Sequence, residues 1–341
     1  MTSDRMPAPT PSESAQQGAA RPRVHFPMWL AILVATAGGA LLAVQSRING
    51  ALGQSLDDGY TAAAISFGSG LVILLIVLCF WKPGRVGLGR VARALRPNAQ
   101  GERELQPWML LGGVAGAFFV ASQGLTAAVL GVALFTVAIV AGQTISGMVL
   151  DRVGLAPGGR RPLTADRVIG SVMALAAVTW AVSAQLAGAV PLWMLIMPFI
   201  AGALAAWQQA VNGRVRAVSE SAQSATLINF IVGSAVLIVI VLVRNSLVGW
   251  PAEFPTEPWL YIGGAIGCLL IAVQTVLVKV TGVLLLGLAT VSGQLVAALL
   301  LDLFTPGQAV AFSTIAGTLI ALAAVVVASG WLTARRRPAS A

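Results

Sequence analysis

The sequence predicts an all-α polytopic membrane protein, with ten transmembrane helices arranged as two inverted five-helix repeats. Three observations support this fold class: 57% of the 341 residues are hydrophobic and only 10% are charged, apolar runs recur along nearly the whole chain, and one part of the sequence repeats another. A soluble globule of this size needs more polar surface than this composition supplies. We therefore expect the chain to lie in lipid.

The apolar runs are each about 20 residues long, which is enough for a helix to cross roughly 30 Å of hydrocarbon. They lack the alternating polarity of transmembrane β-strands. The ten expected spans are residues 28–46, 60–81, 107–127, 131–151, 166–186, 191–213, 222–243, 258–279, 282–302 and 310–332. Residues 1–27 are rich in Pro, Ala, Ser and Gln, which predicts a disordered cytoplasmic tail.

The basic residues predict the orientation of the chain in the membrane. If both termini are cytoplasmic, 19 of the 21 Lys and Arg residues fall on the cytoplasmic side, including the C-terminal segment 335–341, and only Arg47 and Arg244 fall outside. This asymmetry is typical of multi-pass membrane proteins. It also accounts for the net charge of +9, so no nucleic-acid partner is expected.

The long basic segment after the second span allows two interpretations. Leu88, Val91 and Leu95 share one helical face among arginines, so this face could lie against anionic lipid headgroups. The alternative is a solvated loop that its charge retains in the cytoplasm.

An internal duplication relates the two halves. Shifting the chain by 151 positions aligns residues 107–151 with 258–302 without a gap, and 17 of the 45 pairs are identical. Upstream, a shift of 163 positions pairs "QSRING" at 45–50 with "QQAVNG" at 208–213. The first repeat is expected to cover residues 28–188 and the second 189–334.

Each repeat holds five helices, and because five is odd, the second repeat enters the membrane from the opposite side. Inverted repeats are typical of secondary transporters, in which two similar halves move around a shared site near the midplane. A duplication with a purely structural role is the alternative.

Several stretches resemble one bacterial family. The first span ends in "LLAVQSRINGALG", the third begins with "PWMLLGGVAGAFFV", and the fourth reads "GVALFTVAIVAGQTISGMVLDRVG". In these features the chain is similar to the YdcZ-type inner-membrane exporters of the drug/metabolite transporter superfamily, which also includes EamA-like proteins. The resemblance covers roughly residues 28–335. It implies a bacterial inner-membrane location and a central cavity lined by helices of both halves.

Polar side chains within the spans are the candidate site residues, because they are costly in hydrocarbon unless they find partners. Gln45 and Asn49 share a helical face, and Gln208 and Asn212 repeat that spacing. Trp207 could form an aromatic wall. The substrate-binding candidates are Gln45, Asn49, Trp207, Gln208, Asn212, Gln123 and Gln274. The alternative for each amide is a hydrogen bond that joins two helices, and Trp207 could equally be a lipid-facing or core side chain.

Gating or packing roles are expected for two further repeat-related pairs, Gln143 with Gln294 and Asp151 with Asp302. Each of these glutamines follows a glycine that lets another helix come close. The two aspartates are the only acidic residues that close a span. We expect them to pair with basic groups or helix N-termini and to act in gating.

The sequence thus favours a secondary transporter, an exporter or exchanger of a small metabolite or drug-like molecule. The chain has no phosphate-binding loop for ATP and no convergent catalytic or metal-binding set within the spans, so we expect neither an enzyme nor a cofactor or metal. A non-transporting membrane sensor or assembly partner is the alternative. The expected partners are a small-molecule substrate and membrane lipids, and a homodimer stays open.

Overall fold

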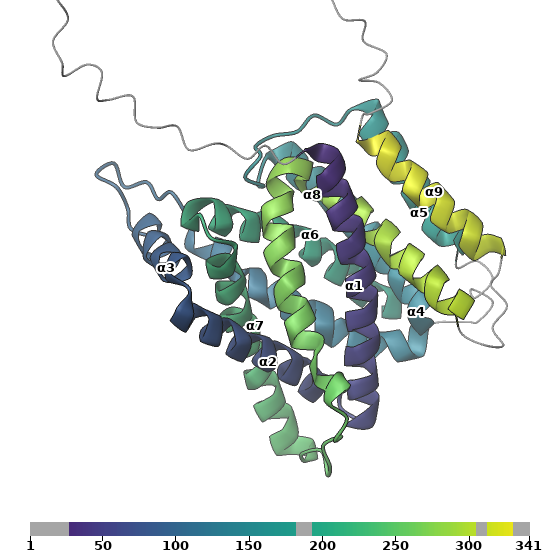
Figure 1. The fold of residues 1–341 in the computed structure, drawn as a ribbon, viewed down its shortest axis with the longest axis horizontal. Coiled ribbons are helices and arrows are strands. Elements are labelled where there is room, and N and C mark those ends of the chain that lie inside the picture. Colours follow the sequence, from purple (N-terminus) through teal and green to yellow (C-terminus); the bar gives the residue numbers. More distant parts are fainter. Residues whose placement is uncertain (1–26, 182–192, 305–311, 330–341) are drawn as a thin grey trace, which may run out of the picture.

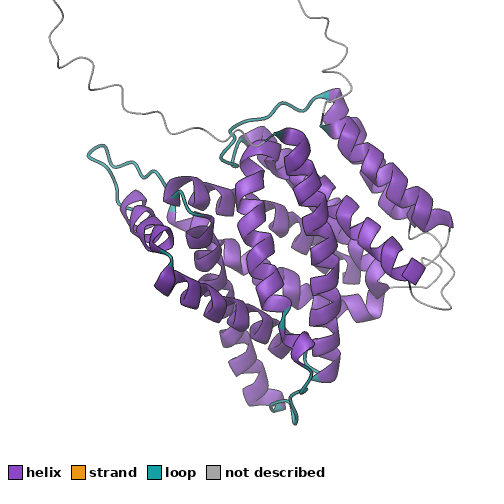
Figure 2. Ribbon diagram, viewed as in Figure 1, coloured by secondary structure: helices purple, strands orange, loops and turns teal. Residues whose placement is uncertain are grey.

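The computed structural model describes residues 27–181, 193–304 and 312–329, and every regular element within them is a helix (Figures 1 and 2). The expected tail, the expected basic C-terminus and the expected boundary between the repeats lie almost entirely outside these residues. The elements are α1 (Met28–Ser55), α2 (Gly59–Phe80), α3 (Lys82–Ala94), η1 (Pro107–Leu111), α4 (Gly112–Val153), α5 (Ala165–Ala181), α6 (Trp193–Ser219), α7 (Ala222–Val248), η3 (Pro258–Tyr261), α8 (Gly263–Phe304) and α9 (Phe312–Ala328).

The outer surface of this helical bundle suits lipid. Among the described residues, four stretches are long and apolar enough to cross a membrane, namely Met28–Ser55, Gly59–Phe80, Ala222–Val248 and Pro258–Ala297, and two shorter apolar helices are Pro107–Gln123 and Ile315–Ala328. Val72, Ile76 and Val243 are each more than half exposed. Large apolar side chains on the outside of a bundle are costly in water but not in hydrocarbon.

The turns that lead into α2 and α7 are built in the same way. Asp57 and Glu220 adopt left-handed conformations, with φ of 49° and 52°, which are uncommon for residues other than glycine. The next residue in each turn caps the following helix: Asp58 accepts two backbone N–H bonds at 3.0 and 3.2 Å, and Ser221 accepts one at 3.2 Å. The shift of 163 positions relates these two turns.

Both 42-residue helical elements, α4 and α8, reverse direction along their length. In α8 the break is Gly282, whose φ of 77° and ψ of 175° are not helical. In α4 both ends lie beside the end of α6: Gly112 packs against Asn212, and Arg214 donates to the carbonyls of Gly154 and Leu155 at 2.9 and 2.7 Å. A straight helix of this length would separate its ends by about 60 Å. Each element therefore holds two of the expected spans.

The basic segment after α2 takes neither of its two expected forms. It forms helix α3, whose Val91 and Ala94 are buried in a cluster with Leu105, Val215 and Ala225. The apolar face of α3 is thus covered by α6 and α7, because glycines on that face let it approach the turn between them. It is neither a solvated loop nor a face left free for lipid headgroups.

The most extensive helix contacts each join the first half to the second: α4 with α6, α1 with α8, α5 with α9, and α2 with α7. The α5–α9 pair forms one edge of the bundle (Figure 1). The contacts occur in matched pairs. A Cβ added to Gly142 would meet the Phe199 carbonyl oxygen at 1.9 Å, and one added to Gly293 would meet that of Thr36 at 1.7 Å. The shifts of 151 and 163 positions convert one contact into the other.

Candidate functional site

A cavity of about 100 Å³ lies between the two halves of the chain. Helices α1, α2, α4, α6, α7 and α8 line it, and Phe67, Phe119 and Phe230 supply aromatic surface. No charged side chain occurs among the described residues of its wall. Its polar surface comes mainly from eight carboxamides, those of Gln45, Asn49, Gln123, Gln143, Gln208, Gln209, Gln274 and Gln294.

The structure brings together most of the residues predicted from the sequence. Five of the seven substrate-binding candidates line the cavity, and so do both glutamines assigned to gating or packing. Asn212 and Trp207 are not part of its wall. Asn212 is buried and donates to Asn229 Oδ1 at 2.9 Å, whereas Trp207 stacks on Trp108 with ring centroids 6.3 Å apart.

Some of the cavity amides are already used to join helices. Gln45 Nε2 donates to the Gly263 carbonyl of α8 at 2.9 Å, and Gln208 Nε2 donates to Asn229 Oδ1 of α7 at 3.0 Å. Gln123 Nε2 donates to Ser46 Oγ at 2.7 Å. These three side chains therefore take the interhelical role that was the alternative for every amide.

Four other glutamines of the wall are unpaired. Gln143, Gln209, Gln274 and Gln294 make no hydrogen bond to any residue that the structure describes. Gln209 is only 5% exposed, and its Oε1 has no partner. The sequence analysis missed Gln209, although the repeat marks it: it stands beside Gln208 and takes the place of Ser46.

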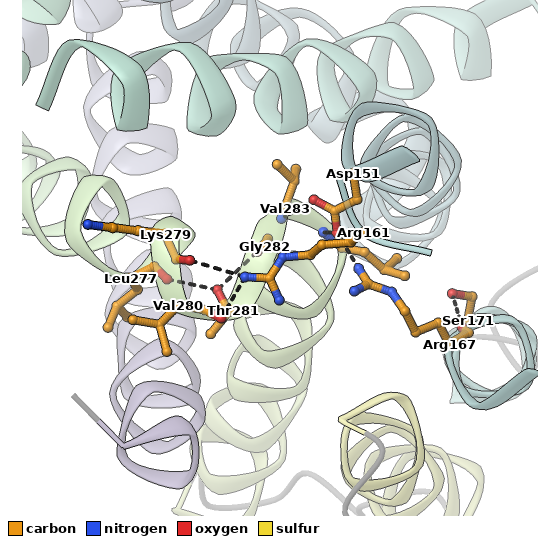
Figure 3. A network of polar contacts seen from close by, with 11 residues as sticks. Asp151, Arg161, Arg167, Ser171, Leu277, Lys279, Val280, Thr281, Gly282 and Val283 are labelled. Carbon is orange, nitrogen blue, oxygen red and sulfur yellow. Dashed lines mark hydrogen bonds and ion pairs between the residues drawn. The ribbon is translucent and has the colours of Figure 1, made fainter. Parts of the chain in front are cut away.

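A network of polar contacts joins the α4–α5 segment to the break in α8 (Figure 3). Asp151, at the end of α4, is fully buried. Its carboxylate accepts hydrogen bonds from the backbone N–H groups of Val283 at 2.8 Å and Leu284 at 3.3 Å, and it forms an ion pair with Arg167 of α5. Asp151 thus caps the second part of α8, directly after the break at Gly282.

Arg161 holds the other side of that break (Figure 3). Its backbone N–H donates to the Asp151 carbonyl at 2.8 Å, and its guanidinium donates to the carbonyls of Lys279 and Val280 at 3.1 and 2.8 Å. Burial lowers the pKa of the Arg161 guanidinium, while the nearby Asp151 raises it and Arg167 lowers it. The two ends of the break are therefore joined to the α4–α5 segment.

Asp302, the repeat counterpart of Asp151, lies in the last turn of α8. Its side chain is outside the described part of the structure. The expected partners of Asp302 therefore stay a prediction.

A second polar cluster joins α2 to α7, away from the network around Asp151. Asp58 is 4% exposed in its side chain and forms an ion pair of 2.7 Å with Arg244, whose guanidinium lies 5.6 Å from the centre of the Tyr60 ring. Asn245 donates to Thr61 Oγ1 at 3.2 Å. The sequence analysis overlooked Asp58, because an acidic residue just outside a span gives no sign of a partner 186 positions away.

Comparison with known proteins places the chain in a family. The family model described as "Putative inner membrane exporter, YdcZ" matches residues 30–180 and 193–327. The chain belongs to the YdcZ family. The match confirms the resemblance seen in the sequence, and its two segments fall one in each predicted repeat. Membership of a YdcZ exporter family supports a membrane protein with a transport role.

The fold also occurs among solved structures. One of 21 matching chains, titled "Crystal structure of protein", has a TM-score of 0.58 and 19% sequence identity, over 91% of this YdcZ-family chain and 98% of the other. At this identity the likeness shows a shared fold alone. No curated protein matches the chain.

Proposed function

We propose that this protein is a secondary transporter, an exporter or exchanger that moves a small molecule across the bacterial inner membrane by alternating access between two inverted five-helix repeats. The observation that carries this proposal is the cavity wall. Both halves contribute repeat-related glutamines to it, Gln123 with Gln274 and Gln143 with Gln294. Such a shared site between two similar halves is what alternating access requires.

The inverted arrangement has support from the helices. Because α4 and α8 each reverse, each half provides five spans when α1, α2 and α5, or α6, α7 and α9, are added. An odd number of spans per half gives the halves opposite orientations, and the matched contacts between halves fit this relation. The distribution of basic residues then puts the network around Asp151 on the cytoplasmic side.

In this proposal the Asp151 network is the cytoplasmic closure. Opening requires the Asp151 carboxylate to separate from the backbone N–H groups of Val283 and Leu284, which moves α4 of the first half away from α8 of the second. By the repeat, Asp302 and Gly131 would form the outer counterpart. The ion pair between Asp58 and Arg244 joins the halves at the outer side.

A cysteine in the cavity tests alternating access without a known substrate. In a variant that lacks Cys79 and Cys268, Ile271→Cys places a thiol in the cavity wall. The rate at which a membrane-impermeant thiol reagent modifies it is measured separately from each side of the membrane. Asp151→Asn is then added, which removes one acceptor and the charge that pairs with Arg167. The rate of thiol modification from the cytoplasmic side should rise by about tenfold, and the rate from the outer side should fall by about tenfold.

The matched control is Glu104→Gln, which removes an exposed carboxylate from the cytoplasmic loop before α4. It should leave both rates unchanged. Unchanged rates in Asp151→Asn would show that this network is no gate, and higher rates from both sides would indicate a leak instead of alternating access.

A further inference from the structure

Resting on the transport role proposed above, we infer that the substrate is a small uncharged molecule with a planar carboxamide or lactam group, held chiefly by Gln209 and Gln274 of the second half. Four features carry this inference: the absence of charge in the cavity wall, the unpaired carboxamides, the asymmetry between the two halves, and the aromatic surface.

The absence of charge among the described residues of the wall selects against ionic substrates. An ion that enters a site of low polarity loses its hydration, and it must be compensated by an opposite charge. The two buried ion pairs among the described residues, Asp151 with Arg167 and Asp58 with Arg244, lie outside the cavity wall, and each of these charges already has a partner. A molecule of zero net charge is therefore the better fit.

The unpaired amides define what that molecule must offer. Each carboxamide has an oxygen that accepts and an NH₂ group that donates. Leaving such groups unpaired in a buried site is costly, and Gln209 Oε1 is one of these groups, in a side chain that is 95% buried. A ligand with only acceptors or only donors would satisfy half of them. A carboxamide or lactam presents one donor and one acceptor side by side, and it can pair with a glutamine through two bonds.

Comparing the two repeats indicates where the amide group of the substrate would bind. In the first half, Gln123 is tied to Ser46 by a bond of 2.7 Å. The equivalent positions in the second half are Gln274 and Gln209, which make no hydrogen bond to any described residue. At this pair of positions the first half has closed its polar pair on itself, whereas the second half keeps both carboxamides free. Over the described wall as a whole, the second half supplies three free carboxamides, Gln209, Gln274 and Gln294, and the first half supplies two, Asn49 and Gln143. The bound molecule therefore sits off the axis between the halves, towards the second half.

Aromatic rings provide the remaining recognition. Phe67 and Phe230 lie 5.0 Å apart between ring centroids at an interplanar angle of 34°, and Phe119 adds a third ring to the wall. Rings bury large flat surfaces and pair well with other planar groups. A planar amide-bearing ring satisfies both the glutamines and this surface.

Nicotinamide and two close analogues test the inference with the full-length protein in liposomes. Nicotinamide is planar, uncharged and carries the amide, nicotinate has a carboxylate instead, and methyl nicotinate has acceptors but no amide donor. We expect saturable counterflow of nicotinamide that is about tenfold faster than that of either analogue. Equal or faster transport of nicotinate or methyl nicotinate would overturn the inference.

Variants locate the amide contact. Gln209→Leu and Gln274→Leu should each lower the ratio of nicotinamide to methyl nicotinate transport by about tenfold, and this ratio does not depend on how much protein is folded. Gln54→Leu is the matched control, because its carboxamide is exposed near the end of α1 and lies outside the cavity wall, and it should leave the ratio unchanged. A loss of selectivity in Gln54→Leu as large as in Gln209→Leu would contradict the proposed amide contact.

The outcome can be separated from that of the transport proposal. If nicotinamide does not move but the cavity cysteine still shows opposite changes from the two sides, the substrate class is wrong and alternating access stands. If neither nicotinamide transport nor the opposite labelling changes occur, both proposals fail.

Discussion

At the scale of single residues, the backbone conformation of Gly282 allows the hydrogen bonds between Asp151 and the second part of α8. Its φ of 77° and ψ of 175° belong to a region that only glycine adopts readily. This conformation ends the first part of α8 and turns the N–H groups of Val283 and Leu284 towards the Asp151 carboxylate. An added Cβ would lie 2.7 Å from Arg161 Nε and 2.8 Å from Asp151 Oδ2.

The Gly282→Ala variant should therefore be less stable than the unchanged protein by about 1–3 kcal/mol. Thermal or SDS denaturation of the purified protein measures this difference. Gly68→Ala in α2 is the control, since an added Cβ there meets nothing within 4 Å and alanine favours a helix. If the two variants were equally stable, Gly282 would not be under the constraint described.

Adjacent residues show what the sequence can and cannot predict at this scale. Gln208 and Gln209 are both polar residues in one apolar helix, so the sequence marks both. Their roles differ because Gln208 finds Asn229 on α7, whereas Gln209 Oε1 finds no partner. The role of a buried amide depends on a residue of another helix, and a single sequence does not reveal which helix that is.

At the scale of helices, four glycines at two crossings set how closely the halves approach. Gly142 of α4 and Gly202 of α6 each lie against the backbone of the other helix, with an added Cβ 1.9 and 2.0 Å from a carbonyl oxygen. Gly39 and Gly293 repeat this arrangement between α1 and α8, at 1.8 and 1.7 Å. Small residues at such crossings let helix backbones pack in a membrane.

The variant Gly142→Ala should separate α4 from α6 and lower the stability by about 1–3 kcal/mol, the usual cost of overpacking. The measurement is the SDS or thermal unfolding curve of the purified protein. Gly50→Ala in α1 serves as the comparison, because an added Cβ there has open space. If the Gly142→Ala variant unfolded at the same temperature or SDS concentration as the Gly50→Ala variant, the crossing of α4 and α6 would not be tight.

The helices themselves were largely predictable, because each apolar run of about 20 residues satisfies its own backbone hydrogen bonds in lipid. The form of α3 was not. Its helical face of Leu88, Val91 and Leu95 was visible, but its contact with α6 and α7 depends on distant residues such as Val215 and Ala225. The partner of Asp151 was equally hidden, since Val283 lies 132 positions away.

At the scale of the whole molecule, charges and uncharged amides are separated. The cavity holds amides and aromatic rings, whereas the buried ion pairs lie away from it, around Asp151 and around Asp58. The duplication predicted a site shared between the halves, and side chains of both halves line the cavity. It could not predict that the Gln209 and Gln274 side chains stay free while Gln123 pairs with Ser46, because that difference comes from one position, Ser46 against Gln209.

The central claim is that the two halves cross the membrane in opposite senses, and the side on which equivalent loops emerge tests it most directly. Arg103 lies before α4 and Glu253 before α8, and both are exposed. Each is replaced by cysteine in a chain without Cys79 and Cys268, and an impermeant thiol reagent is added to intact spheroplasts. Cysteine at position 253 should react at once and cysteine at position 103 only after permeabilisation. Reaction of both from the same side would contradict the account.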